Sequence, residues 1–257
     1  MTESFIHAAA DGPVATVRID RPALRNALSL GMAGAIAEAV ETFDADPAIR
    51  VIAIRGSDEW FSAGADLKEL PPSRETAKAA RDYDTRISAA VARLAACRTP
   101  TVALLNGPVI GGASAFAVAC DMRVAARRCY FRIPVARNGL FYAPVDARRL
   151  LALVGPGIAK WMMMSGETVS SEQALTWGLI TALYDDDTFD DESRRLLETI
   201  AAGAPLSLRY TKLTLDAPSD ETDLTAEAYE RIYASPDPRE GLAAVREKRT
   251  PRFRGDG

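Results

Sequence analysis

Short apolar strands alternate with helical segments along the first part of the chain, and this alternation limits the fold more than any other feature. Apolar and other residues alternate from Val14 to Ile19, and mostly apolar residues fill Val51 to Ile54 and Thr101 to Leu105. Such runs are typical of strands, and the two runs of mostly apolar residues indicate strands that are buried on both faces. Between the first two runs, residues 29–43 carry apolar side chains at helical spacing. We therefore predict an α/β fold with βαβ-like organisation up to about residue 190.

The second half of the chain adds further elements of both kinds. Strands are predicted at 122–126 and 130–133, and helices at 113–119, 145–153 and 158–164. The sequence from Ser170 to Gln173 is a capping box, which starts another short helix before Gly178.

From about Asp190 the pattern is helical and more polar, with breaks at Pro205, Pro218 and Pro236. Neither tandem repeats nor low-complexity segments are present. We therefore predict two regions, a core at 1–195 and a C-terminal helical region at 196–257.

Composition and charge exclude several classes of protein. A net charge of −4 and a pI near 5.3 leave no excess of positive charge to neutralise a nucleic-acid backbone. No apolar run reaches membrane-spanning length, and residues 1–10 lack the pattern of a signal peptide. We expect a cytoplasmic protein that has no membrane span and binds no nucleic acid.

Histidine and cysteine usage restricts the available chemistry. His7 is the only histidine, so neither a Ser/His/Asp triad nor a histidine metal site is expected. Cys97, Cys120 and Cys129 show no metal-binding spacing, and their odd number favours buried free thiols. We predict no metal site.

Two segments, 61–67 and 106–113, place small residues where a strand passes into a loop or helix. Small residues let a ligand approach the backbone. If both loops face one cleft, the N–H groups of Ala65 and Gly112 could bind a carbonyl oxygen that gains negative charge, as an oxyanion hole does. Tight turns and close helix packing are the alternative explanation for either loop taken alone.

The order and spacing of many motifs resemble the crotonase superfamily, also called the enoyl-CoA hydratase/isomerase family. These motifs are Arg21-Pro22, Asn26-Ala27-Leu28, Phe61 to Leu67, Asn106-Gly107, Gly111-Gly112, Cys120-Asp121, Gly139-Leu140, Ser165-Gly166, Gly178-Leu179, Glu240-Gly241 and Glu247-Lys248-Arg249. The resemblance implies a crotonase spiral of ββα units, whose C-terminal helices pack subunits into homotrimers or, as dimers of trimers, hexamers. It also implies lyase or isomerase chemistry on acyl-CoA, as in fatty acid metabolism.

The resemblance further implies a site for acyl-CoA, in which coenzyme A is part of the substrate and no other cofactor is needed. Its loop would be Ala63, Gly64, Ala65, Asp66 and Leu67, with Arg25 and Lys68 near the phosphates and Tyr229 and Lys248 contributed by the helical region, from the same or a neighbouring subunit. Solvated surface cations are the alternative for Arg25 and Lys68.

Three positions at which family members carry catalytic acids are apolar here, namely Ala115, Val135 and Ala143. The two glutamates typical of the family's hydratases are therefore missing, and no Asp or Glu lies within 111–119 or 130–144 to replace them. We expect ordinary hydratase activity to be very weak or absent.

Two nearby residues are candidate substitutes. Asp146 could move a proton, although capping of the following helix is the favoured alternative. Tyr142 could donate a proton or hydrogen bond, with packing as its alternative. Three functions stay open: an enzyme with an atypical active site, a non-catalytic acyl-CoA binding or carrier protein, and a structural partner with a remnant site.

Overall fold

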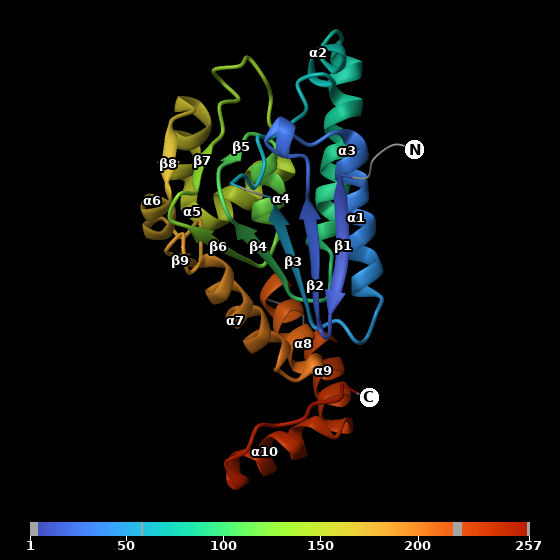
Figure 1. Ribbon diagram of the computed structural model, residues 1–257. Coiled ribbons are helices and arrows are strands. Elements are labelled where there is room, and N and C mark those ends of the chain that lie inside the picture. Colours follow the sequence, from blue (N-terminus) through green and yellow to red (C-terminus); the bar gives the residue numbers. More distant parts are fainter. Residues whose placement is uncertain (1–4, 58, 218–222, 256–257) are drawn as a thin grey trace.

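The computed structural model describes residues 5–57, 59–217 and 223–255 (Figure 1). A six-stranded sheet forms its centre, in the order β1-β2-β3-β4-β6-β9. The strands are β1 (Ile6–Asp11), β2 (Val14–Ile19), β3 (Val51–Gly56), β4 (Thr101–Leu105), β6 (Met122–Ala126) and β9 (Ala182–Tyr184). β1 and β2 form an antiparallel hairpin, and the other neighbours are parallel. Parallel neighbours require crossover connections, and here helices supply most of them.

A smaller sheet has the order β5-β7-β8. It contains β5 (Val109–Ile110), β7 (Tyr130–Arg132) and β8 (Thr168–Ser170). β5 pairs with β7 in parallel, and β7 pairs with β8 in antiparallel fashion. This sheet fixes the position of the loop that follows β5.

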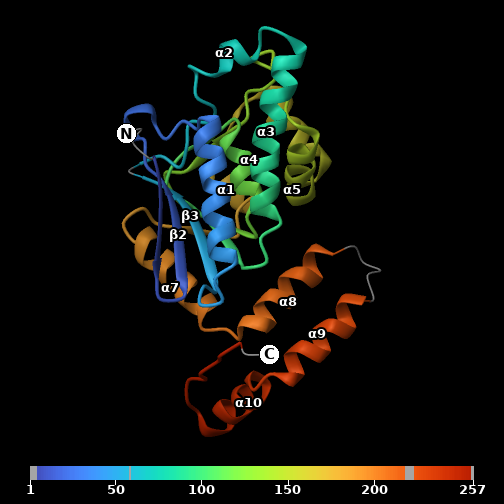
Figure 2. The same ribbon diagram turned by 90° about the vertical axis from the view of Figure 1, so that its right-hand side faces the viewer.

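One face of the large sheet is covered by α1 (Leu30–Asp44), α3 (Ala77–Ala95), α4 (Ala113–Ala119) and α5 (Pro144–Ser165). The short α2 (Leu70–Ser73) packs on α3, α6 (Ser171–Thr176) lies against β7, β8 and β9, and the 3-10 helix η1 (Pro22–Leu24) buries none of its residues. α1 and α3 lie side by side (Figure 2). Apolar side chains of these helices and of the sheet form the main core, which includes Ile36, Ile54, Leu94, Leu105 and Phe116.

A single helix, α7 (Phe189–Ala201), covers part of the opposite face. Its buried Phe189 and Leu197 pack against Val51 and Val102 of the sheet. The boundary predicted after residue 195 lies inside this helix, which belongs with the core by its packing.

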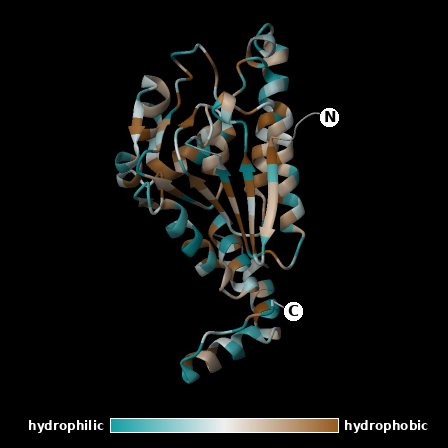
Figure 3. Cartoon of the chain, viewed as in Figure 1, coloured by the Kyte–Doolittle hydropathy of each residue, from teal (hydrophilic) through white to brown (hydrophobic). Residues whose placement is uncertain are grey.

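Three further helices extend away from the core (Figures 1 and 2). They are α8 (Pro205–Asp216), α9 (Asp223–Ala234) and α10 (Asp237–Glu247). The strands of the large sheet are mostly hydrophobic, whereas these helices mix hydrophilic and hydrophobic residues (Figure 3). Some of their large apolar side chains are exposed, including Leu215 at 80% and Val245 at 77%. Assembly into trimers or hexamers stays a prediction.

Most predicted elements are confirmed. The strands at 101–105 and 122–126 and the helix at 113–119 have the predicted bounds, and the capping box of Ser170 and Gln173 is present. The helices predicted at 145–153 and 158–164 are confirmed as the two helical parts of α5, which are separated at Gly155, where φ is +74° and the backbone is not helical. β1 and α3 have no counterpart among the predicted elements. The break predicted at Pro218 lies outside the described residues.

The three cysteines are free and buried, as predicted. Burial raises the pKa of the Cys120 thiol to about 12, so this side chain stays protonated and inert. Within the described ranges, no helix is long and apolar enough to cross a membrane. In the same ranges, no group of three or more His, Cys, Asp or Glu side chains is placed to hold a metal ion.

Candidate functional site

Backbone hydrogen bonds join the two small-residue loops to each other and to the segment before α1. The N–H of Ser62 donates to the carbonyl oxygen of Pro108 at 3.1 Å, and the N–H of Ile110 donates to that of Ser62 at 3.0 Å. On the other side, the N–H of Leu28 donates to the carbonyl oxygen of Gly64 at 2.7 Å. The segment 62–66 therefore lies between two backbone segments that hold it from both sides.

Gly64 allows the two loops to approach each other closely. Its φ is +91°, and a Cβ at this position would lie 2.5 Å from the carbonyl oxygen of Ile110 and 3.5 Å from the nitrogen of Gly112. No side chain fits such a gap, and the backbone angle also disfavours one. The close approach brings the backbone at Ala65 and Gly112 to the same cavity.

The N–H groups of Ala65 and Gly112 have no acceptor within the chain, as far as the described residues show. Both residues line a cavity of about 170 Å³. By the same measure a single water needs roughly 10–15 Å³, so the space suits a larger ligand. Two backbone donors without an intramolecular acceptor thus belong to residues that line a space that a ligand can fill.

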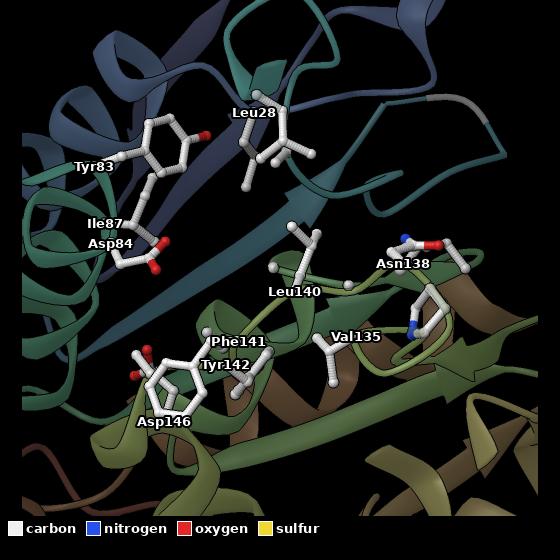
Figure 4. Close-up of a pocket in the computed structure, with 18 of the residues that line it drawn as sticks. Leu28, Tyr83, Asp84, Ile87, Val135, Asn138, Leu140, Phe141, Tyr142 and Asp146 are labelled. Atoms are coloured by element: carbon white, nitrogen blue, oxygen red, sulfur yellow. The ribbon is translucent and has the colours of Figure 1, made fainter. Parts of the chain in front are cut away.

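The structure brings most of the predicted site residues together around this cavity (Figure 4). Those that line it are Ala63, Ala65, Leu67, Gly112, Ala115, Val135, Tyr142, Ala143 and Asp146. The three apolar positions thus lie in the same space as the two backbone donors. The remaining predicted residues lie in the loop itself, on exposed surface or in the C-terminal helices.

Asp66 holds the shape of its loop. Its side chain is buried and forms an ion pair with Arg21 at 2.6 Å, and it accepts a hydrogen bond from the N–H of Lys68 at 2.8 Å. Burial alone would raise the pKa of Asp66, but these two hydrogen bonds hold it below its ordinary value. The carboxylate therefore stays charged and engaged with its own loop.

Arg25 and Lys68 are exposed cations beside this loop. The carbonyl oxygen of Arg25 accepts from the N–H of Ala63 at 2.9 Å, and its guanidinium lies over the ring of Trp60, 5.1 Å from the centroid. The contact limits the positions of the Arg25 side chain. Both cations are thus available to a ligand that contacts the loop from outside the cavity.

Tyr229 and Lys248 do not line the cavity. Tyr229 lies on α9, exposed and stacked on Tyr233 with ring centroids 5.5 Å apart. Lys248 is the C-cap residue that follows α10, with a φ of +53°. Both belong to the helices that extend from the core (Figure 2), so within one chain they lie apart from the site.

Asp146 lies in the first turn of α5 and is 2% exposed. Ser88 of α3 donates to its carboxylate at 3.1 Å, and Arg149 forms an ion pair with it at 2.7 Å. Burial raises the pKa of Asp146 above its ordinary value, although both partners oppose the shift. The predicted capping role is wrong, because Ala143 is the N-cap residue of α5 and no side chain caps it.

The hydroxyl of Tyr142 lies 3.1 Å from the hydroxyl of Ser114. Ser114 donates its single hydrogen to the carbonyl oxygen of Gly111, so Tyr142 must be the donor to Ser114. Burial raises the pKa of Tyr142 far above its ordinary value, and the phenol therefore stays neutral. Tyr142 links the loop before α5 to the start of α4 and cannot act as a base in this state.

The side of the cavity formed by α2, α3 and the start of α5 carries polar side chains of which only Asp146 is among the predicted site residues. The others are Arg74, Tyr83, Asp84 and Ser88, and with Asp146 they form what we call the polar wall. Figure 4 shows Tyr83 and Asp84 opposite Leu140. A helical signal was present in the sequence, because Tyr83, Ala90, Val91 and Leu94 recur at helical spacing after the N-cap Thr76.

Comparisons with known proteins cover almost the whole chain. Residues 9–256 match the family model for enoyl-CoA hydratase/isomerase. The chain is 32% identical over 247 residues to 2,3-dehydroadipyl-CoA hydratase of Escherichia coli, with 94% of this chain and 95% of that protein covered. It is 31% identical to carnitinyl-CoA dehydratase of Salmonella enteritidis, with 99% and 100% covered. A solved enoyl-CoA hydratase/carnithine racemase from Magnetospirillum magneticum matches with a TM-score of 0.93 at 33% identity, over 99% and 97% of the two chains.

Proposed function

We propose that this chain, which belongs to the enoyl-CoA hydratase/isomerase family, binds an acyl-CoA thioester in the cavity between its two small-residue loops. Its fold is the crotonase fold predicted from the sequence. In the proposed complex, the thioester carbonyl oxygen accepts hydrogen bonds from the N–H groups of Ala65 and Gly112. The observation that carries this proposal is that both N–H groups lack an acceptor in the described chain and belong to residues that line one cavity.

This pair of donors supplies a specific chemistry. Fixed donors aimed at an oxygen stabilise negative charge that develops on it, and one such donor contributes roughly 10²- to 10³-fold to the rate in enzymes. A thioester held in this way loses an α-proton more readily, because the resulting enolate charge lies on the bound oxygen. The hydrogen bonds on both sides of segment 62–66 keep the two donors in place before a ligand arrives.

Coenzyme A would lie along the Ala63 to Leu67 loop. Asp66 and its ion pair with Arg21 hold this loop, while Arg25 and Lys68 present positive charge beside it. Tyr229 and Lys248 do not line the cavity of their own chain, and α9 and α10, which carry them, extend away from the core (Figure 2). We propose that they contact coenzyme A bound to a neighbouring subunit of a trimer or hexamer.

The reaction would differ from ordinary hydration, because Ala115, Val135 and Ala143 line the cavity and none can move a proton. Asp146 is the candidate acid or base, since it lines the same cavity and its raised pKa lies closer to neutrality than that of an exposed aspartate. Tyr142 would orient the loop rather than transfer a proton, since its hydrogen is donated to Ser114.

A non-catalytic acyl-CoA binding or carrier protein is the second candidate. The apolar lining at Ala115, Val135 and Ala143 favours it, because such a pocket holds an acyl chain without acting on it. The engaged carboxylate of Asp146 is also consistent with a structural link between α3 and α5.

Three measurements on the same preparation test these proposals. Calorimetry with crotonyl-CoA measures binding, and a spectrophotometric assay measures its hydration. Mass spectrometry of butyryl-CoA incubated in D₂O measures exchange of the α-protons. We expect binding, negligible hydration and measurable exchange. Binding without exchange would favour the carrier, hydration at the rate of an ordinary hydratase would contradict the proposed chemistry, and failure to bind would exclude the acyl-CoA site.

A further inference from the structure

Two polar atoms of the polar wall are buried without a hydrogen-bond partner. Among the side chains that the structure describes, the buried atoms in this condition are the Tyr83 hydroxyl, Arg74 Nε and the Ser193 hydroxyl. Tyr83 and Arg74 are among the residues that line the cavity, whereas Ser193 lies on α7. Buried polar groups are almost always paired in folded proteins. Two unpaired donors on one wall of a ligand cavity therefore indicate a partner that arrives with the ligand.

Tyr83 and Arg74 form one local group. The Arg74 guanidinium lies over the Tyr83 ring, 5.2 Å from its centroid. The same guanidinium forms an ion pair with Asp84 at 2.7 Å and donates to the carbonyl oxygen of Ala80 at 3.2 Å. These contacts occupy both terminal nitrogens and leave Nε free, so the orientation of Arg74 is fixed without its third donor being used.

The Tyr83 hydroxyl points away from α3 toward Leu28, which lies in the segment joined to Gly64 (Figure 4). The tyrosine side chain is almost fully enclosed, with 6% of the residue exposed. Leu28 and Ile87 supply apolar surface nearby. A ligand oxygen that reaches this place would be shielded from water, which makes a hydrogen bond there selective.

We propose that the acyl group of the substrate carries a neutral oxygen acceptor, a ketone or hydroxyl distal to the thioester, which binds the Tyr83 hydroxyl and Arg74 Nε. This assignment rests on the proposed acyl-CoA site and names the class of acyl chain that it selects. Tyr83 is a specificity-determining residue in this scheme and takes no part in proton transfer at the α-carbon.

The surrounding charges favour a neutral acceptor over a carboxylate. Burial, together with the negative charges of Glu69, Asp84 and Asp66, raises the pKa of Tyr83 to about 12, although the positive charge of Arg74 opposes the shift. The phenol is therefore a neutral donor in a region where carboxylates outnumber cations. Asp84 already neutralises Arg74, and Arg149 neutralises Asp146. A carboxylate on the acyl chain would therefore meet no cation of the polar wall that is not already paired with an aspartate.

A protein–ligand double-mutant cycle by calorimetry tests the inference. The probes are hexanoyl-CoA, 4-oxohexanoyl-CoA, 5-oxohexanoyl-CoA and adipyl-CoA, and the proteins are wild type, Tyr83→Phe and Tyr184→Phe. Tyr184 packs on the opposite face of the sheet and serves as the matched control. One net hydrogen bond corresponds to about a 5-fold change in affinity. We expect wild type to bind one of the oxo compounds at least about 5-fold more tightly than hexanoyl-CoA, and Tyr83→Phe to lose this difference.

Each outcome supports or overturns a separate claim. The assignment is supported if Tyr184→Phe keeps the preference for an oxo compound over hexanoyl-CoA and Tyr83→Phe loses it. Equal affinity of wild type for hexanoyl-CoA and both oxo compounds overturns it, as does an unchanged preference in Tyr83→Phe. If adipyl-CoA binds most tightly of the four probes, the claim that the acyl group carries a neutral acceptor is wrong. If even hexanoyl-CoA fails to bind, the proposed acyl-CoA site itself is wrong.

Discussion

The two sides of the cavity present different atoms to a ligand. On one side, the loops at 61–67 and 106–113 offer backbone N–H groups held by backbone hydrogen bonds. On the other, the polar wall offers the side chains of Arg74, Tyr83, Asp84, Ser88 and Asp146. Backbone donors suit the thioester, which is the same in every acyl-CoA. Side chains suit the acyl group, which differs from one acyl-CoA to another, because a substitution can alter a side chain without altering the fold.

The loop side should be the less tolerant of change, and Gly64→Ala provides the largest test. The added Cβ would lie 2.5 Å from the Ile110 carbonyl oxygen at a φ of +91°. We expect the free energy of unfolding to fall by about 4 kcal/mol, from backbone strain together with overpacking. Urea denaturation measures this change.

Gly111→Ala is the control for that variant, since its φ of +54° is also left-handed but no atom lies within 4 Å of the added Cβ. We expect it to cost about 1 kcal/mol. If both variants lose the same free energy of unfolding, the close contact between the two loops at Gly64 contributes nothing to the effect of Gly64→Ala.

The donor at Gly112 is tested by comparing Gly112→Pro with Gly112→Ala. The φ of Gly112 is −61°, which proline adopts, and proline lacks the N–H. Alanine retains the N–H, and its Cβ meets no atom within 4 Å. We expect the proline variant to exchange the α-protons of butyryl-CoA about 100-fold more slowly than the alanine variant. Similar exchange rates in both variants would show that the N–H of Gly112 does not contribute to the reaction.

Asp146 tests whether the polar wall also performs chemistry. If Asp146 is the base, exchange should rise with pH through its raised pKa and then level off, because only the carboxylate accepts a proton. Asp146→Asn should slow the exchange about 100-fold or more. Ser88→Ala removes one hydrogen bond to the same carboxylate and should shift the profile to higher pH, since that bond lowers the pKa. If the exchange rate does not depend on pH, a group other than Asp146 transfers the proton.

The same raised pKa has a consequence for stability. The folded state binds the Asp146 proton more tightly than the unfolded state, in which the pKa is near 3.8. The stabilising contribution of this proton is therefore present below the unfolded-state pKa and is lost as the pH rises through the folded-state value. Wild type should lose this contribution over that window, whereas Asp146→Asn should not, as denaturation at several pH values would show.

The smallest effect is expected for the unpaired phenol of the polar wall. Tyr83→Phe removes a buried hydroxyl without a partner, so we expect the free energy of unfolding to rise by about 1 kcal/mol. Tyr210→Phe is the matched control, because its hydroxyl donates to Glu227 at 2.8 Å, and it should lose about 1 kcal/mol. A loss in both variants would indicate that the Tyr83 hydroxyl has a partner in solution.

Much of the fold follows from local pattern. The strands at 101–105 and 122–126 are mostly apolar, and the helix at 113–119 is built of small residues that begin after Gly111-Gly112. α3 (Ala77–Ala95) was not predicted, because many charged and small residues separate its large apolar positions. With α3 missing, the polar wall could not be foreseen.

The sequence by itself determined the strand and helix alternation, the two small-residue loops and the lack of carboxylates at positions 115, 135 and 143. Only the tertiary structure decided that Asp146 is buried against α3 rather than capping α5, and that Tyr83 points into the cavity. The reason is physical. Local patterns depend on neighbours along the chain, whereas burial and pairing depend on which helix face meets a segment distant in sequence.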